Sequence, residues 1–169
     1  MITIATIEDI PQLTFLINSA YRGETSKKGW TTEAFILEGK RTTEAELKEA
    51  LDDHKNTILK FTNANSIIGS VLLTTKQNQL YLGMLTVSPE IQNTGIGKKL
   101  LVAAENHAKT LQLNSIVMTV ISVREELIAW YKRNGYSDTG VREPFPKNDI
   151  HISIAKEPLE FIFLEKSVS

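Results

Sequence analysis

A glycine-rich turn between an apolar run and a helix-like pattern is the stretch best suited to bind an anion. Residues 85–101 read LTVSPEIQNTGIGKKLL, in which one residue separates Gly95 from Gly97. Glycine has no Cβ, so the backbone there can turn tightly and expose its N–H groups. At a helix start the first four N–H groups lack an intrahelical acceptor, and the macrodipole is positive. With Lys98 and Lys99 following, the turn predicts a site for a phosphate-bearing ligand.

Two common phosphate-binding loops do not fit these residues. A P-loop requires glycine where Gln92 stands and Ser or Thr where Lys99 stands. A dinucleotide fingerprint requires a third glycine at the position of Leu100. The pattern that the residues do form is V-x-P-x-x-Q-x-x-G-x-G, from Val87 to Gly97.

A second motif brings a group that can donate a proton. Residues 131–136 read YKRNGY, at the end of a predicted helix whose acidic start and basic end suit the helix dipole. A tyrosine hydroxyl has an ordinary pKa of about 10, so it is protonated at neutral pH and can act as a general acid.

The two motifs resemble those of the GNAT superfamily of N-acetyltransferases, which has Q/R-x-x-G-x-G/A after its fourth strand and Y-x-x-x-G-F/Y after its fifth. The resemblance implies that acetyl-CoA is the acyl donor. The backbone of Leu85, Thr86 and Val87 would bind the pantetheine amides and the acetyl carbonyl. The residues that would hold the pyrophosphate form one run: Gln92, Asn93, Thr94, Gly95, Ile96, Gly97 and Lys98.

By the same resemblance, Tyr131 would be the general acid that protonates the leaving thiolate of coenzyme A. The alternative is that Tyr131 packs beside Leu127 as an ordinary core residue. The chain also departs from the family pattern, because Arg124 and Leu127 stand where many relatives have Asn and Ala. Ser122 or Arg124 could substitute for the cofactor contact of that Asn.

The acceptor side is less constrained. The strand-like run 80–87 contains no carboxylate or His, so the candidates for a general base are Glu24, Glu33, His151 or water alone. Glu24, Trp30 and Glu33 could recognise a cationic amine by charge and cation–π contact. We expect the acceptor to be a primary amine, on a small metabolite or on a peptide. A non-catalytic acyl-CoA-binding or sensing module is the alternative, since binding needs the turn but not the acid.

Composition limits the other classes of function. The chain has 169 residues, 41% of them hydrophobic and 23% charged, which suits one soluble domain over residues 1–169. Its net charge of −1 gives no general attraction to nucleic acid or to anionic membranes. There is no cysteine, which excludes disulfides, thiolate metal sites and a Cys nucleophile. We expect a cytoplasmic protein with no metal, no membrane segment and no nucleic-acid partner, with a homodimer left open.

The elements that must position these motifs follow from periodicity. Alternating and β-branched runs predict strands at 2–7, 57–62, 67–75, 79–87, 115–121, 136–141 and 159–165. Apolar residues at three-to-four spacing predict helices at 8–20, 43–53, 96–111 and 124–134. The stripe of the third helix would be Ile96, Leu100, Ala104, Ala108 and Leu111.

Three local features refine this order of elements. Thr43 and Glu46 have the spacing of a capping box, and Gly83 within a strand suggests a bulge or a close approach to the backbone. Residues 21–42 break the pattern, with at most a short helix over 32–37, and residues 144–158 form an insertion. The order β-α-α-β-β-β-α-β-α-β-β resembles that of GNAT proteins. It implies an α/β (α+β) fold with a mixed, mostly antiparallel, V-shaped seven-stranded sheet and about four helices, in which strands four and five splay apart.

Overall fold

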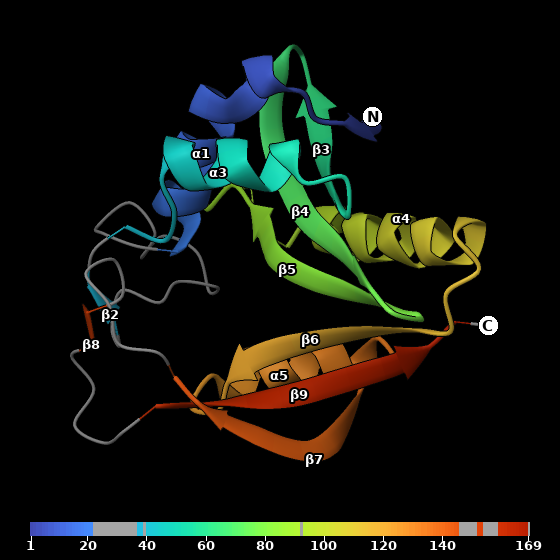
Figure 1. Ribbon diagram of the computed structural model, residues 1–169. Helices are drawn as coiled ribbons and strands as arrows, with labels where there is room; N and C mark the ends of the chain where they lie inside the picture. The colour runs from blue at the N-terminus through green and yellow to red at the C-terminus, as the bar shows by residue number, and fades with distance from the viewer. Residues whose placement is uncertain (22–36, 39, 92, 146–151, 154–158, 169) are drawn as a thin grey trace.

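A seven-stranded mixed sheet organises the chain in the computed structural model, which describes residues 1–21, 37–38, 40–91, 93–145, 152–153 and 159–168 (Figure 1). Its spatial order is β1 (Ile2–Ile4), β3 (Asn56–Asn63), β4 (Ser66–Lys76), β5 (Gln79–Val87), β6 (Ser115–Ile121), β9 (Glu160–Ser167) and β7 (Ser137–Pro144). Every pairing is antiparallel except that of β5 with β6. The predicted mixed and mostly antiparallel sheet is therefore confirmed.

The parallel pair β5–β6 is short, and this opens the middle of the sheet. Pairing extends over three residues of β5, from Gln79 opposite Ser115 to Tyr81 opposite Val117. Beyond Tyr81 the two strands diverge toward the carboxyl ends of both (Figure 1). The V-shape expected between the fourth and fifth strands of the main sheet is present.

A bulge in β5 lies just beyond this point. Leu72 of β4 pairs with Gly83, but Ser70 pairs with Thr86, so two residues of β5 face one residue of β4. The residue in the left-handed region is Met84, with φ of +48°, rather than the neighbouring Gly83. A bulge leaves backbone groups outside the ladder and turns the strand. The bulge therefore bends β5 where it leaves β6.

Helices cover both faces of the sheet. On one face, α1 (Ile10–Tyr21) and α3 (Glu44–Asp52) pack on β3 and β4, whereas α4 (Ile96–Thr110) packs on the other face of these strands and α5 (Glu125–Arg133) joins the same core as α4. The alternation of strand residues produces the two cores, since Ile58 belongs to the first and Leu59 to the second.

The apolar stripe of α4 is confirmed at four of its five predicted positions. The buried residues include Ile96, Leu100, Ala104 and Ala108, but Leu111 is 44% exposed, so its assignment to the stripe was wrong. The helix ends at Thr110. After the turn that follows, Leu113 is the residue that is buried in the same core as the stripe.

Capping residues explain two element boundaries. The first strand stops at Ile4, earlier than predicted, because the N–H of Thr6 donates to Asp9 Oδ2 at 2.8 Å and a short 3₁₀ helix, η1 (Ile7–Asp9), begins there. The predicted cap of α3 is present, with Glu46 N–H donating to Thr43 Oγ1 at 3.1 Å.

Two segments that the sequence left irregular meet through their backbones. Of the short helix expected over 32–37, only Leu37 is described, and it belongs to a strand, β2 (Leu37–Glu38). This strand pairs with β8 (Ile152–Ser153) from the predicted insertion. Tyr21, placed at the start of the irregular segment, is the last residue of α1. None of the helices in the described part of the chain has the length and apolar character needed to cross a bilayer.

Candidate active site

The glycine turn forms an anion cradle at the start of α4. Gly95 is the N-cap and has φ of +84°, a conformation that L side chains rarely adopt. The first hydrogen bond of the helix runs from Lys99 N–H to the Gly95 carbonyl at 3.1 Å. The N–H groups of Ile96, Gly97 and Lys98 therefore have no acceptor within the helix and lie at its positive end.

A cavity of about 100 Å³ lies directly above this cradle. Eight of the ten residues predicted to bind the cofactor line it: Leu85, Val87, Asn93, Thr94, Gly95, Ile96, Gly97 and Lys98. Of the other two, Gln92 lies outside the described residues, and Thr86 is buried with its hydroxyl donating to the Met84 carbonyl at 2.8 Å. Helix α5 forms part of the wall of this cavity through Leu127, Trp130 and Tyr131. A Cβ on Gly97 would lie 3.4 Å from the ring of Trp130.

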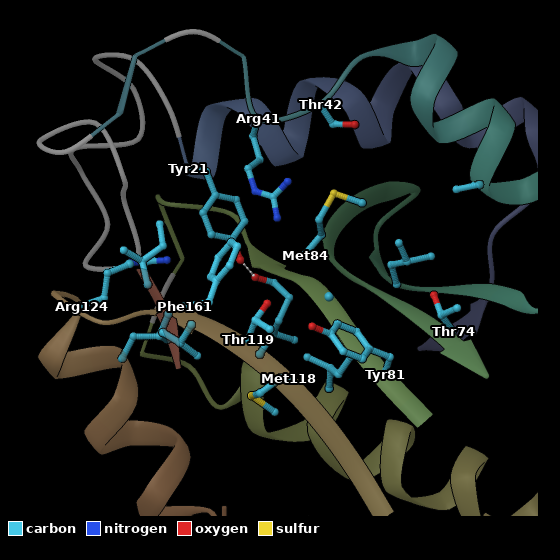
Figure 2. A pocket seen from close by; sticks show the side chains of 18 of the residues that line it. Tyr21, Arg41, Thr42, Thr74, Tyr81, Met84, Met118, Thr119, Arg124 and Phe161 are labelled. Atoms are coloured by element: carbon cyan, nitrogen blue, oxygen red, sulfur yellow. Dashed lines mark hydrogen bonds between the residues drawn. The ribbon is translucent and has the colours of Figure 1, made fainter. Parts of the chain in front are cut away.

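A second, larger cavity opens on the other side of the diverging strands (Figure 2). Its volume is about 450 Å³, within the range of small-molecule sites. The residues that line both this cavity and the smaller one are Tyr21, Leu85, Leu127 and Tyr131. The glycine turn thus lines the smaller cavity, and the splayed strands line the larger one. The four shared residues lie at the junction of the two cavities.

Tyr131 is held rigidly at this junction. It is 5% exposed, and its ring makes edge contacts with Trp130 and Tyr136 at centroid distances of 5.1 and 5.9 Å. Burial, with a smaller contribution from nearby Tyr21, raises the pKa of its hydroxyl well above the ordinary value, although the Arg124 charge opposes this. The phenol stays protonated and can donate a proton but cannot act as a base. Tyr131 therefore packs in the core with Leu127 and also lines both cavities.

Tyr21 is a residue of the junction that the sequence analysis missed. Its hydroxyl donates a hydrogen bond to the carbonyl of Leu85, in the bulged part of β5. The guanidinium groups of Arg41 and Arg124 lie 5.6 and 5.8 Å from the centre of its ring. Its spacing from Ile17 continues the apolar face of α1 and could have indicated burial, but the contact with Leu85 has no signal in the sequence.

The residues predicted to recognise the acceptor lie outside the described part of the chain. These are Glu24, Trp30 and Glu33, together with His151 as a candidate base. In the described wall of the larger cavity the carboxylate is that of Glu46, in the first turn of α3. Within the described residues, no three side chains of His, Asp or Glu come together as a metal site would require.

Comparison with known proteins agrees with this geometry. A family model described as an acetyltransferase (GNAT) domain matches residues 24–152. The fold is similar to that of the ribosomal-protein-S18-alanine N-acetyltransferase from Escherichia coli, with a TM-score of 0.75 and 12% identity over 100% of this chain and 94% of that one. It is also similar to an N-acetyltransferase from Staphylococcus aureus Mu50, with a TM-score of 0.73 and 17% identity over 100% and 98% of the two chains.

A ribosomal-protein-alanine N-acetyltransferase from Brucella melitensis has a TM-score of 0.73 at 16% identity, over 99% of each chain. No curated protein matches the sequence. At such identities the similar structures show the fold, whereas the family model covers more than half of the chain. The chain therefore belongs to the GNAT acetyltransferase family and is an acyltransferase.

Proposed function

We propose that the protein is an acetyl-CoA-dependent N-acetyltransferase, in which a neutral primary amine attacks the thioester directly within a ternary complex. The observation that carries this proposal is the position of Tyr131 on the walls of both cavities. A donor in one cavity and an acceptor in the other would meet beside a single protonated phenol.

The smaller cavity fits the carrier end of acetyl-CoA. Three N–H groups at the start of α4 and the charge of Lys98 would bind the diphosphate, and Gly95 and Gly97 leave room for its oxygens. The bulged end of β5 would bind the pantetheine arm through the backbone from Leu85 to Val87. Acetyl-CoA would supply an activated acyl group as a thioester.

Two protein groups would assist the transfer. A backbone N–H at the bulge would stabilise negative charge that develops on the thioester oxygen, an effect worth about 3 kcal/mol per donor. Tyr131 would donate its proton to the departing thiolate. The C–N bond forms as the C–S bond breaks, the nitrogen loses a proton to water, Tyr131 regains a proton from solvent, and the products are an amide and a free thiol. Since the chain has no cysteine, no cysteine acyl-enzyme precedes this step.

The larger cavity would hold the acceptor. Burial raises the pKa of Tyr81 in its wall, so neither Tyr81 nor Tyr131 is suited to deprotonate the amine. Similar structures named for ribosomal-protein alanine support a peptide N-terminus as one class of acceptor, and the volume of about 450 Å³ supports a small amine as the other. We also propose a cytoplasmic location and no metal requirement.

An acetylation assay with a panel of amines tests this function. The wild-type protein should release free coenzyme A from acetyl-CoA only when an acceptor amine is present.

Gly97→Val should weaken acetyl-CoA binding at least tenfold in calorimetry, because the added methyl groups would enter the cavity beside Trp130. Equal affinity would refute the cradle. Binding of acetyl-CoA without turnover of any amine would instead support the non-catalytic module.

A further inference from the structure

Two guanidinium groups reach the larger cavity beside the junction. Arg41 lies just before α3, and Arg124 is the N-cap of α5, so they come from distant parts of the chain. Both line the cavity, and Figure 2 shows them around Tyr21, at the end of the cavity away from Thr74. The charged side chains of the described wall are these two cations and Glu46. The described wall therefore offers guanidinium N–H donors to a ligand at this end.

The positions of the two arginines are fixed by the fold. The ring of Tyr21 is buried, and its hydroxyl is tied to the Leu85 carbonyl. Both guanidinium groups lie within 6 Å of the centre of this ring, a range in which cations interact with aromatic faces. The backbone before α3 is also tied to α1, since Arg41 N–H donates to Asn18 Oδ1 at 2.7 Å.

An arginine beside an aromatic ring keeps its recognition chemistry. The guanidinium group has five N–H donors in one plane, and one partner does not use all of them. This planar fork matches the two oxygens of a carboxylate. Arg41 and Arg124 are therefore suited to bind a carboxylate of the acceptor.

The distance between the arginines and the reacting centre limits where that carboxylate can be on the acceptor. The amine must lie near Tyr131 and Leu85, which line both cavities. The hydroxyl of Tyr21 is hydrogen-bonded to the Leu85 carbonyl at this centre, and the guanidinium groups of both arginines lie beside the Tyr21 ring. An amine bound at the junction and an anion bound by these arginines would therefore both lie beside Tyr21.

The rest of the cavity wall is largely apolar. Its apolar side chains include Leu72, Leu82, Met84, Met118, Val120 and Phe161. Hydroxyl groups of Thr74, Thr119 and Tyr81 are interspersed. Such a wall suits an apolar or weakly polar body of the ligand.

From these three features we infer that the acceptor is a free amino acid, with its carboxylate held by Arg41 and Arg124 and an apolar side chain directed toward Met118 and Tyr81. The inference rests on the proposed acetyl transfer and names its substrate class. The transfer step itself, from thioester to amide, is unchanged.

Sets of three acceptors test this inference with acetyl-CoA as donor. Leucine, leucinamide and isoamylamine form one set, and phenylalanine, phenylalaninamide and phenethylamine form another. An aminoalkylphosphonate of similar size and an alanine-terminated peptide complete the panel. Coenzyme A release gives kcat/KM for each. We expect the free amino acids to exceed their amides and decarboxylated amines by at least tenfold.

Variants connect the preference to the arginines. Arg41→Gln and Arg124→Gln should each raise KM for the amino acid at least tenfold and change kcat/KM for the decarboxylated amine less than threefold. Lys76→Gln is the matched control, because Lys76 lies 4.3 Å from the ring of Tyr81 without lining the cavity. It should leave both values unchanged. An unchanged midpoint of denaturant unfolding confirms that each variant is folded.

The outcomes separate the two proposals. Equal or faster turnover of the amides, the decarboxylated amines or the peptide would overturn the amino-acid assignment and leave the acetyltransferase intact. A preference for the phosphonate would likewise overturn the carboxylate assignment. Failure of every amine would count against both proposals. Loss of the carboxylate preference in Lys76→Gln but not in Arg41→Gln would show that the anion is bound elsewhere.

Discussion

Removing the hydroxyl of Tyr131 is the most direct test of the proposed chemistry. Tyr131→Phe keeps the ring and its edge contacts with Trp130 and Tyr136. Because burial raises the pKa of the phenol well above its ordinary value, the wild-type group is protonated at every pH at which the enzyme would be assayed. The variant should therefore lose the general-acid contribution, typically about 10² to 10⁴ in kcat, or roughly 3 to 5 kcal/mol of activation free energy.

Tyr136→Phe is a matched control for this change. Tyr136 is also buried, at 2% exposure, and its hydroxyl has no hydrogen-bond partner among the described residues. It contacts the ring of Tyr131 but lines neither of the two cavities. Its replacement should leave kcat unchanged. It should not lower the free energy of unfolding, since an unpaired buried polar group is lost.

Steady-state coenzyme A release, measured from pH 6 to pH 10 with the preferred acceptor, compares the three proteins. Calorimetry should show the same acetyl-CoA affinity for all of them, because the cradle lies at the start of α4. A kcat for Tyr131→Phe within threefold of the wild-type value would refute the acid role. A loss of activity near pH 8 that disappears in the variant would contradict the raised pKa instead, since it would mean that the phenol ionises there.

Three predictions concern stability, each measured by denaturant unfolding. Gly69→Ala should lower the free energy of unfolding by about 1–3 kcal/mol, because a Cβ would lie 3.1 Å from side chains of α4; an unchanged midpoint would contradict this close approach. Thr43→Ala should cost about 1 kcal/mol through loss of the hydrogen bond from Glu46 N–H, whereas Thr43→Ser should not. Burial alone would raise the pKa of Asp9, but the ammonium of Lys60, 2.8 Å away, lowers it. The contribution of the Asp9 carboxylate to the free energy of unfolding is therefore present above the ordinary pKa of about 3.9, and it is lost as the pH falls further. Asp9→Asn should destabilise the protein at pH 7 more than at pH 2, and an equal difference at both would argue against the ion pair.

Features with a local cause were predictable from the sequence. The cap of α3, the cradle at Gly95 and most of the stripe of α4 follow from residues a few positions apart. Leu111 was misassigned because periodicity does not show where a helix ends. The bulge was expected near Gly83, but Met84 has the positive φ, and a Met gives no local indication of that conformation.

Contacts between distant residues were not predictable in this way. The hydrogen bond from Tyr21 to Leu85 joins residues 64 positions apart, and the approach of Arg41 and Arg124 to one ring depends on three separate elements. The motifs cover Tyr131 and the eight predicted residues that line the smaller cavity, because these lie on β5, α4, α5 and the turn before α4. They carry no information on most of the larger cavity, whose walls also come from α1, α3, β4, β6 and β9.

One structural cause accounts for both cavities. If β5 and β6 paired along their whole length, the ladder would fill the space that Tyr131 now reaches from α5; instead pairing stops at Tyr81 and the bulge bends β5 away. The smaller cavity is formed by the glycine turn and the end of β5 together with Leu127, Trp130 and Tyr131 of α5. The larger cavity is lined by strand residues and by two side chains at element ends, Arg41 before α3 and Arg124 at the start of α5. Substitution at these two positions should therefore change which amine is accepted while leaving the sheet, the cradle and the acid in place.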